Sequence, residues 1–171
     1  MSQHTIADVE TLLEGMTQQL RSHLKTHQLD EPLMIGIHTG GVWVAEQLHQ
    51  RLGLQQPLGT LDISFYRDDF SRIGMNPEVK PSNLPFDVED RTIILVDDVL
   101  QTGRTIRAAL NEIFDYGRPA RVILAALLER SGHELPIRAD ITGERIELAA
   151  DEQVKLTGPD NMSLSIQSSH E

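Results

Sequence analysis

Two consecutive acidic residues, Asp97 and Asp98, follow a run of β-branched and aliphatic residues in this chain, and Thr102-Gly103-Arg104-Thr105 comes four residues later. A Thr-Gly-Arg-Thr run of this kind is typical of a turn that opens a helix. Backbone N–H groups at such a turn point outward without partners, and the helix N-terminus adds partial positive charge, so the turn suits a phosphomonoester. Ionised carboxylates only accept hydrogen bonds, and an adjacent pair suits the two hydroxyls of a ribose. The spacing therefore predicts a site for a ribose 5-phosphate.

Several other nucleotide sites are excluded by the same segment. It lacks the glycine pattern of a dinucleotide-binding turn, and nowhere does the chain contain the G-x-x-x-x-G-K-[ST] run that holds nucleoside triphosphates. The spacing alone leaves three alternatives open. The acid pair could bind magnesium, accept a phosphoryl group, or be only the polar end of a strand.

The elements that must position this segment can be read from hydrophobic periodicity. Apolar residues at steps of three and four predict a helix over residues 6–29, and a second helix is expected after the turn His38-Thr39-Gly40-Gly41. The acid pair is expected to end its strand, and a helix is expected to run from Thr102 to Tyr116. Strands are predicted at residues 33–37, 58–66, 92–96 and 121–128, with small strands and a hairpin after residue 145. Alternating strands and helices with short connections predict an α/β fold with a mostly parallel sheet, whose ligands bind at the carboxyl ends of the strands.

Residues 67–91 interrupt this alternation. They contain several glycine, asparagine and proline residues without sustained periodicity, which predicts a long, flexible, exposed loop. No internal repeat or second domain is visible, so residues 1–171 are expected to form a single domain.

Composition removes further classes of function. The 171 residues include 15 Lys plus Arg against 26 Asp plus Glu, for a net charge of −11, and no cysteine. Disulfide frameworks, thiolate catalysis and thiolate zinc sites are therefore excluded, and the charge argues against general nucleic-acid binding. With no apolar run long enough to span a membrane and no signal-peptide pattern, the protein is expected to be cytoplasmic and to bind no membrane. All eight cations of residues 91–145 are arginines, which favour planar oxyanions, so a phosphate site is expected in this block.

The run Ile94-Leu-Val-Asp-Asp-Val-Leu-Gln-Thr-Gly-Arg-Thr-Ile106 resembles the phosphoribosylpyrophosphate (PRPP) signature of type I phosphoribosyltransferases. Further segments, at residues 61–69, 102–109, 115–119 and 134–140, are similar to the PyrR proteins, which are pyrimidine operon regulators that also act as uracil phosphoribosyltransferases. The similarity extends from about Met34 to Ile166. It implies a type I phosphoribosyltransferase fold with a small hood, formed by residues 129–140, and a C-terminal hairpin.

The resemblance also implies roles for individual residues. Asp97 and Asp98 would bind the ribose hydroxyls, and Asp98 and Arg67 would be catalytic. The 5-phosphate would lie on Gln101, Thr102, Gly103, Arg104 and Thr105. The leaving pyrophosphate would lie on His38, Thr39, Gly40 and Gly41, a turn whose peptide is often cis in the family. The base would contact Val99, Leu135, Pro136 and Ile137, and Glu129 would lie near the magnesium that accompanies PRPP.

The implied reaction is uracil plus PRPP giving UMP and diphosphate. Two alternatives from other classes stay open: a non-catalytic regulator that senses nucleotides, and a purine phosphoribosyltransferase. RNA is a possible partner, but Gly40, Glu46 and Gln47 stand where the regulators have cations, and RNA affinity scales with the number of such cations. We therefore expect weak RNA binding. A homodimer or a higher homo-oligomer is expected.

Overall fold

The computed structural model describes residues 6–63 and 82–168, and its centre is a five-stranded sheet. The strand order is β2-β1-β3-β4-β5, and every neighbouring pair is parallel. The strands are β1 (Leu33–Ile37), β2 (Gly59–Leu61), β3 (Thr92–Leu100), β4 (Arg121–Arg130) and β5 (Ile141–Ile146). An antiparallel pair, β6 (Glu152–Thr157) and β7 (Ser163–Ser168), completes the chain as a hairpin. The predicted α/β fold is confirmed.

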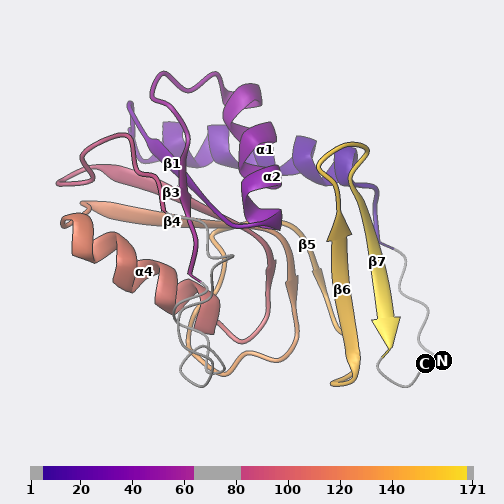
Figure 1. Cartoon of the computed structure of the whole chain (residues 1–171). Helices are drawn as coiled ribbons and strands as arrows, with labels where there is room; N and C mark the ends of the chain where they lie inside the picture. Colours follow the sequence, from indigo (N-terminus) through magenta and orange to yellow (C-terminus); the bar gives the residue numbers. More distant parts are fainter. Residues whose placement is uncertain (1–5, 64–81, 169–171) are drawn as a thin grey trace.

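Helices cover both faces of the sheet. Helices α1 (Val9–Thr26) and α2 (Gly40–Leu52) lie on one face, and α4 (Arg104–Tyr116) lies on the other, as Figure 1 shows. The pleat of β1 explains the division, because Leu33, Ile35 and Ile37 pack toward α4 whereas Met34 packs toward α1 and α2. A strand buried on both faces must be apolar throughout, which is why β1 lacks polar alternation.

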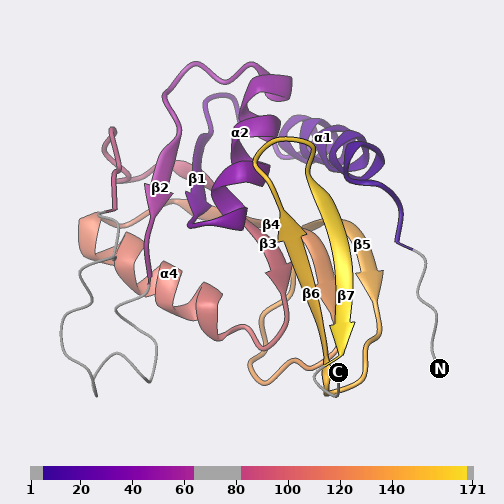
Figure 2. The ribbon, with the colours of Figure 1, turned by 45° about the vertical axis from the view of Figure 1, so that its right-hand side comes forward.

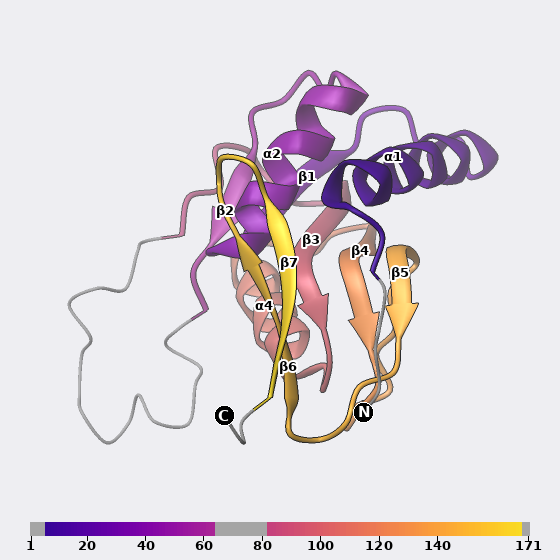
Figure 3. The ribbon, with the colours of Figure 1, turned by 90° about the vertical axis from the view of Figure 1, so that its right-hand side faces the viewer.

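The hairpin stands outside the five-stranded sheet, beside its carboxyl ends and close to α2 (Figures 2 and 3). Its apolar side chains Val154, Leu156, Met162 and Leu164 pack against the same core as α1 and α2. Trp43 of α2 lies under the tip, where a Cβ on Gly158 would be 3.0 Å from the Trp43 ring. Contacts distant in sequence thus fix the hairpin at the edge where a ligand is expected.

Several predicted boundaries differ from the structure. The first helix is shorter than residues 6–29, since Asp8 caps it by accepting a hydrogen bond from the Thr11 N–H. The acid pair does not end its strand: β3 continues to Leu100, because the backbone at Asp97 and Val99 pairs with β4 regardless of side-chain polarity. The strand predicted after residue 145 begins earlier, as β5.

The predicted loop over residues 67–91 is also shorter at its C-terminal end. Residues 67–81 lie outside the described part, but Leu84, Phe86 and Val88 pack against the α4 side of the core. Asn83 forms an isolated bridge with Thr60 of β2. Among the described residues, no helix is both long enough and apolar enough to span a membrane.

Candidate functional site

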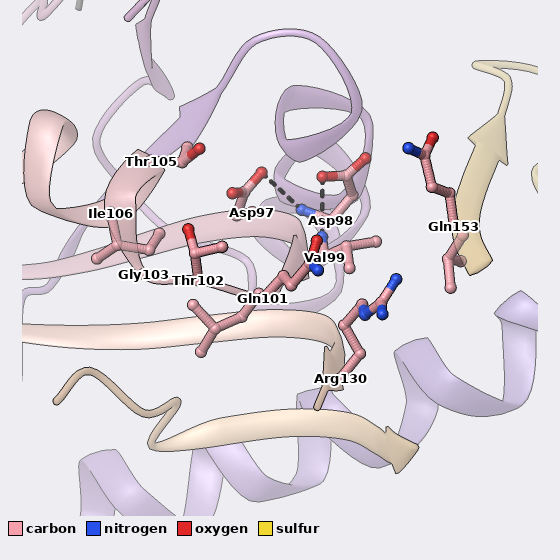
Figure 4. Close-up of a pocket in the computed structure, with 12 residues that line it drawn as sticks. Asp97, Asp98, Val99, Gln101, Thr102, Gly103, Thr105, Ile106, Arg130 and Gln153 are labelled. Carbon is pink, nitrogen blue, oxygen red and sulfur yellow. Dashed lines mark hydrogen bonds between the residues drawn. The ribbon is translucent and has the colours of Figure 1, made fainter. Parts of the chain in front are cut away.

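The acid pair lies in the last part of β3, at the carboxyl edge of the sheet. Asp97 Oδ1 accepts a hydrogen bond from the Asp98 N–H at 2.9 Å, and Asp98 Oδ1 accepts one from the Val99 N–H at 2.8 Å. Asp97 is 6% exposed and Asp98 is half-buried. Both side chains line the pocket drawn in Figure 4. Backbone hydrogen bonds therefore orient both carboxylates, which can accept hydrogen bonds from ligand hydroxyls.

The turn between β3 and α4 is open toward the same pocket. Gly103 has φ of +94°, the left-handed region that favours glycine. The Thr102 hydroxyl accepts a hydrogen bond from the Arg104 N–H at 3.1 Å, and the N-cap residue of α4, Gly103, has no side chain to cap the N–H groups that follow. A helix N-terminus with a glycine N-cap has N–H groups to offer and partial positive charge, which suits a phosphate group.

The predicted pyrophosphate turn packs directly on the acid pair. The peptide bond between His38 and Thr39 is cis, and the His38 N–H donates to the Leu61 carbonyl at 2.9 Å. A Cβ at Gly40 would overlap the Asp98 carboxylate. A Cβ at Gly41 would lie 2.8 Å from the Val96 carbonyl oxygen. Two segments separated by about sixty residues thus meet without room for another side-chain atom.

The pocket itself has a volume of about 280 Å³. Its lining includes every residue of the predicted PRPP-binding set except Arg104, together with Val99. The remaining lining residues are Leu100, Ile106, Arg130, Gln153 and Val154. The turn from His38 to Gly41 borders the acid pair without lining this pocket.

Gln153 and Val154 were missed by the sequence analysis. Alternation predicts a strand around them, but it does not tell which face meets a site, because the hairpin is placed by packing on α2. Arg130 was expected only as part of the hood. Burial lowers the pKa of its guanidinium, an effect that the Glu152 carboxylate partly opposes. Arginine nevertheless stays charged throughout the physiological pH range.

The hood packs against the phosphate turn. The N–H groups of Glu134 and Leu135 both donate to the Thr102 carbonyl at 3.0 Å. The side chains of Leu135 and Ile137 lie 3.3 Å from where a Gly103 Cβ would be. Neither they nor Pro136 line the pocket. Base binding by these three residues stays a prediction, and the structure gives the hood a supporting contact with the turn.

Glu129 does not line this pocket, and its carboxylate is bound by other residues of the chain. It is 3% exposed, and Oε1 accepts a hydrogen bond from the Ala139 N–H at 2.8 Å. Its Oε2 atom forms ion pairs with Arg145 at 3.2 Å and with Arg138 at 3.7 Å. In the described part of the chain, no cluster of three or more His, Asp or Glu side chains could hold a metal. Its predicted role near magnesium stays a prediction, and so does the role of Arg67, which lies outside the described residues.

Exposed arginines are spread over the molecule within one chain. Arg121 begins β4, whereas Arg138 and Arg145 meet at Glu129 near the other end of that strand. A strand of ten residues spans roughly 30 Å. Arg121 therefore does not share one continuous basic patch with Arg138 and Arg145.

Comparison with known proteins agrees with this geometry. The family model described as "Phosphoribosyl transferase domain" matches residues 2–161. A protein of Nitrosococcus oceani named "Bifunctional protein PyrR" is 60% identical over 162 residues, covering 94% of this chain and 92% of that protein. The protein of the same name from Pseudomonas aeruginosa is 56% identical over 153 residues, covering 90% of each chain.

Solved structures show the same fold at much lower identity. A hypoxanthine-guanine phosphoribosyltransferase from Bacillus anthracis matches with a TM-score of 0.67 and 17% identity, covering 85% of each chain. A purine phosphoribosyltransferase from Pyrococcus horikoshii matches with a TM-score of 0.59 and 22% identity, covering 80% of this chain and 87% of that one. At such identities the likeness establishes the fold.

Proposed function

Since the chain belongs to the PyrR family of phosphoribosyltransferases, we propose that it is a uracil phosphoribosyltransferase that converts uracil and PRPP to UMP and diphosphate. The observation that carries this proposal is the single pocket shared by Asp97, Asp98 and the turn of residues 101–105. An acid pair beside an open helix N-terminus is complementary to the two hydroxyls and the phosphate of a ribose 5-phosphate.

Binding of the sugar phosphate follows from this arrangement. The 5-phosphate accepts hydrogen bonds from the turn, and the ribose hydroxyls donate to Asp97 and Asp98. The anomeric carbon then faces the region between the acid pair and Val99. The pyrophosphate is expected beside the turn from His38 to Gly41, which already contacts Asp98.

The reaction breaks the bond between the anomeric carbon and the pyrophosphate oxygen and forms a bond to uracil N1, whose proton is released. The carboxylates of Asp97 and Asp98 place negative charge near a ring that becomes cationic in the transition state. Asp97 and Asp98 would offer carboxylate oxygens, which magnesium prefers, to an ion that accompanies PRPP. Such an ion would supply neutralisation of charge on the leaving group. The protein itself contributes mainly positioning and electrostatics.

Nucleotide formation from different bases tests the proposal directly. The protein is incubated with Mg²⁺ and PRPP together with uracil, hypoxanthine or guanine in separate reactions, and the products are separated by chromatography. UMP is expected from uracil, with no purine nucleotide from the other two bases. Formation of IMP or GMP without UMP would overturn the base assignment, and no nucleotide from any base would overturn the enzyme assignment.

The purine alternative is not favoured, because relatives at 55 to 60% identity carry the name "Bifunctional protein PyrR". That name supports a second activity in this chain, and regulation by binding a pyrimidine-operon leader RNA is the second candidate. The dispersed arginines predict weak binding by a single chain, so any RNA surface must combine arginines from more than one copy. Affinity for the leader RNA should fall steeply as salt rises, and no retention of RNA at low salt would exclude this activity.

A further inference from the structure

The segment between β5 and β6 is anchored to the end of β4 by a dense set of hydrogen bonds. The Ser131 N–H donates to the Ile146 carbonyl, and the Ser131 hydroxyl exchanges hydrogen bonds with the backbone of Leu148. Glu152 closes the segment on itself, because its Oε1 accepts a hydrogen bond from the Ala149 N–H at 2.7 Å. The start of the hairpin is therefore fixed relative to the central sheet.

Arg130, which lines the pocket, makes further contacts of this anchor. Its Nη1 donates to the Glu152 carbonyl, its Nη2 to the Ala149 carbonyl at 3.2 Å, and its Nε to the Ser131 carbonyl at 3.1 Å. The residue is 3% exposed and forms no ion pair within residues 6–63 and 82–168. Burying a charge is costly unless hydrogen bonds satisfy it, and a planar guanidinium can satisfy three acceptors at once.

The acceptor at Glu152 stands directly before the two hairpin residues that reach the pocket. Gln153 and Val154 line it together with Arg130 and Val99. In Figure 4, Gln153 and Arg130 lie across the pocket from Thr105, where the 5-phosphate is expected. Val99 and Val154 offer apolar surface for a flat ring, and the Gln153 amide can both donate and accept hydrogen bonds at its edge.

We propose that Arg130 is a positioning residue that fixes the C-terminal hairpin so that Gln153 and Val154 form the wall for the nucleobase. This inference rests on the proposed function, because it assigns the end of the pocket away from the phosphate turn to the base. Arg130 acts through the backbone of Glu152 and not by a contact with the reacting atoms. Loss of its three hydrogen bonds displaces the wall while leaving the phosphate turn and the acid pair in place.

A comparison of two ligands that differ only by the base distinguishes a positioning role for Arg130 from a general effect on protein stability. Calorimetry measures the affinity of UMP and of ribose 5-phosphate for the wild type and for Arg130→Lys. In this variant one ammonium group replaces the guanidinium that donates to three backbone carbonyls. UMP affinity should fall about tenfold, and ribose 5-phosphate affinity should change less than about twofold, since small displacements of positioning groups have effects of this order. In turnover, KM for uracil should rise while KM for PRPP stays constant.

Ser131→Ala is the matched control, because it removes side-chain hydrogen bonds from the same segment without touching the pocket lining. It should leave both affinities unchanged. An equal loss of UMP affinity in Ser131→Ala would assign the effect to the whole segment and overturn the specific role of Arg130. Equal losses of UMP and ribose 5-phosphate in Arg130→Lys would also overturn it.

Trp43 reports whether the hairpin stays docked in each variant. It is the only tryptophan of the chain and lies against Gly158 at the far end of the hairpin. An unchanged emission spectrum in Arg130→Lys is expected, because the apolar side of the hairpin still packs on the core. A spectrum shifted to that of an exposed tryptophan would mean that the substitution undocks the whole hairpin, and the loss of UMP affinity would then reflect the fold and not the placement of Gln153 and Val154, which would overturn the positioning role.

Gln153→Ala tests the wall with the Arg130 contacts intact. It should lower the affinity for UMP severalfold and leave the affinity for ribose 5-phosphate unchanged. An unchanged affinity for UMP would overturn the inference. Failure of the proposed function looks different, since the wild type would then bind neither ligand or form no UMP from uracil and PRPP. Wild-type binding and turnover without a selective effect in these variants would overturn the inference alone.

Discussion

Two strand-to-helix turns lie side by side at the carboxyl edge of the sheet, and they are built in opposite ways. The turn from β1 to α2 is filled, because Gly40 and Gly41 press against the acid pair with no space for a Cβ. The turn from β3 to α4 is open, with Gly103 in the left-handed region and no capping side chain at this N-cap position. The same topology therefore provides a packed backbone support and an exposed anion cradle.

The difference shows that two neighbouring strand-to-helix turns of one parallel sheet can have different roles. An anion site needs exposed N–H groups, whereas a carboxylate pair needs a rigid neighbour that keeps it oriented. The filled turn orients Asp98 by packing, and the open turn receives the ligand. Four substitutions distinguish these roles, and they are given in order of decreasing expected effect.

Asp98→Asn should have the largest effect, because it removes the charge that faces the ribose while keeping the shape. We expect kcat/KM to fall about 100-fold, the order reported for loss of one group that stabilises transition-state charge. Steady-state kinetics with uracil and PRPP measures it. Asp115→Asn, an exposed carboxylate near the end of α4, serves as the control and should match the wild type. Equal activity of Asp98→Asn and wild type would remove the acid pair from the mechanism.

Gly40→Ala tests the filled turn. The added methyl group would overlap the Asp98 carboxylate, so Asp98 or the turn must move, and overpacking of this kind costs about 1–3 kcal/mol. Thermal unfolding should show the loss, and PRPP affinity should fall with it. Gly15→Ala in α1 is the matched control, because nothing lies within 4 Å of its Cβ position, and it should stabilise the protein by about 0.5–1 kcal/mol. A stable, fully active Gly40→Ala would contradict the close packing of the two segments.

Gly103→Ala tests the open turn. A non-glycine residue at φ of +94° is strained by about 1–3 kcal/mol, and its Cβ would lie 3.3 Å from the hood side chains of Leu135 and Ile137. Gly53→Ala, at φ of +64° with nothing within 4 Å, has positive φ without such contacts. Gly103→Ala should lose PRPP affinity and unfold at a lower temperature than Gly53→Ala. Equal unfolding temperatures would mean that the hood contact adds nothing.

Arg104→Ala should have the smallest effect. Its ion pair with Glu134 has a distance of 2.8 Å and joins the open turn to the hood, but the two side chains are 67% and 54% exposed. Exposed pairs contribute roughly 0–1 kcal/mol and are weakened by salt. Thermal unfolding at low and high salt should show a difference from wild type that shrinks as salt rises. A large, salt-independent loss would indicate that the pair is more than a surface contact.

The central part of the site could be predicted from the sequence because it is local. Asp97, Asp98 and residues 101–105 share one strand and one turn, so their spacing alone places them together, and the structure brings them into one pocket except for Arg104. Strand–helix alternation likewise predicts the parallel sheet, since apolar runs such as that of β3 are typical of strands buried on both faces.

The rest depends on contacts that local patterns do not contain. Gln153 and Val154 reach the pocket only because the hairpin packs on α2 and Arg130 holds its start. Glu129 binds two arginines from segments that follow it by nine and sixteen residues, and its sequence neighbours give no sign of this pairing. The prediction that the acid pair ends its strand is wrong because polar side chains do not end a strand whose backbone continues to pair with β4.

Titration calorimetry with PRPP and Mg²⁺ tests the central claim most directly. The wild type should bind with saturable heat, and the double variant Asp98→Asn plus Thr105→Ala, with wild-type thermal unfolding as its folding control, should show greatly weakened binding. Absence of heat in the wild type, or unchanged affinity in the folded double variant, would contradict a sugar-phosphate site between β3 and α4.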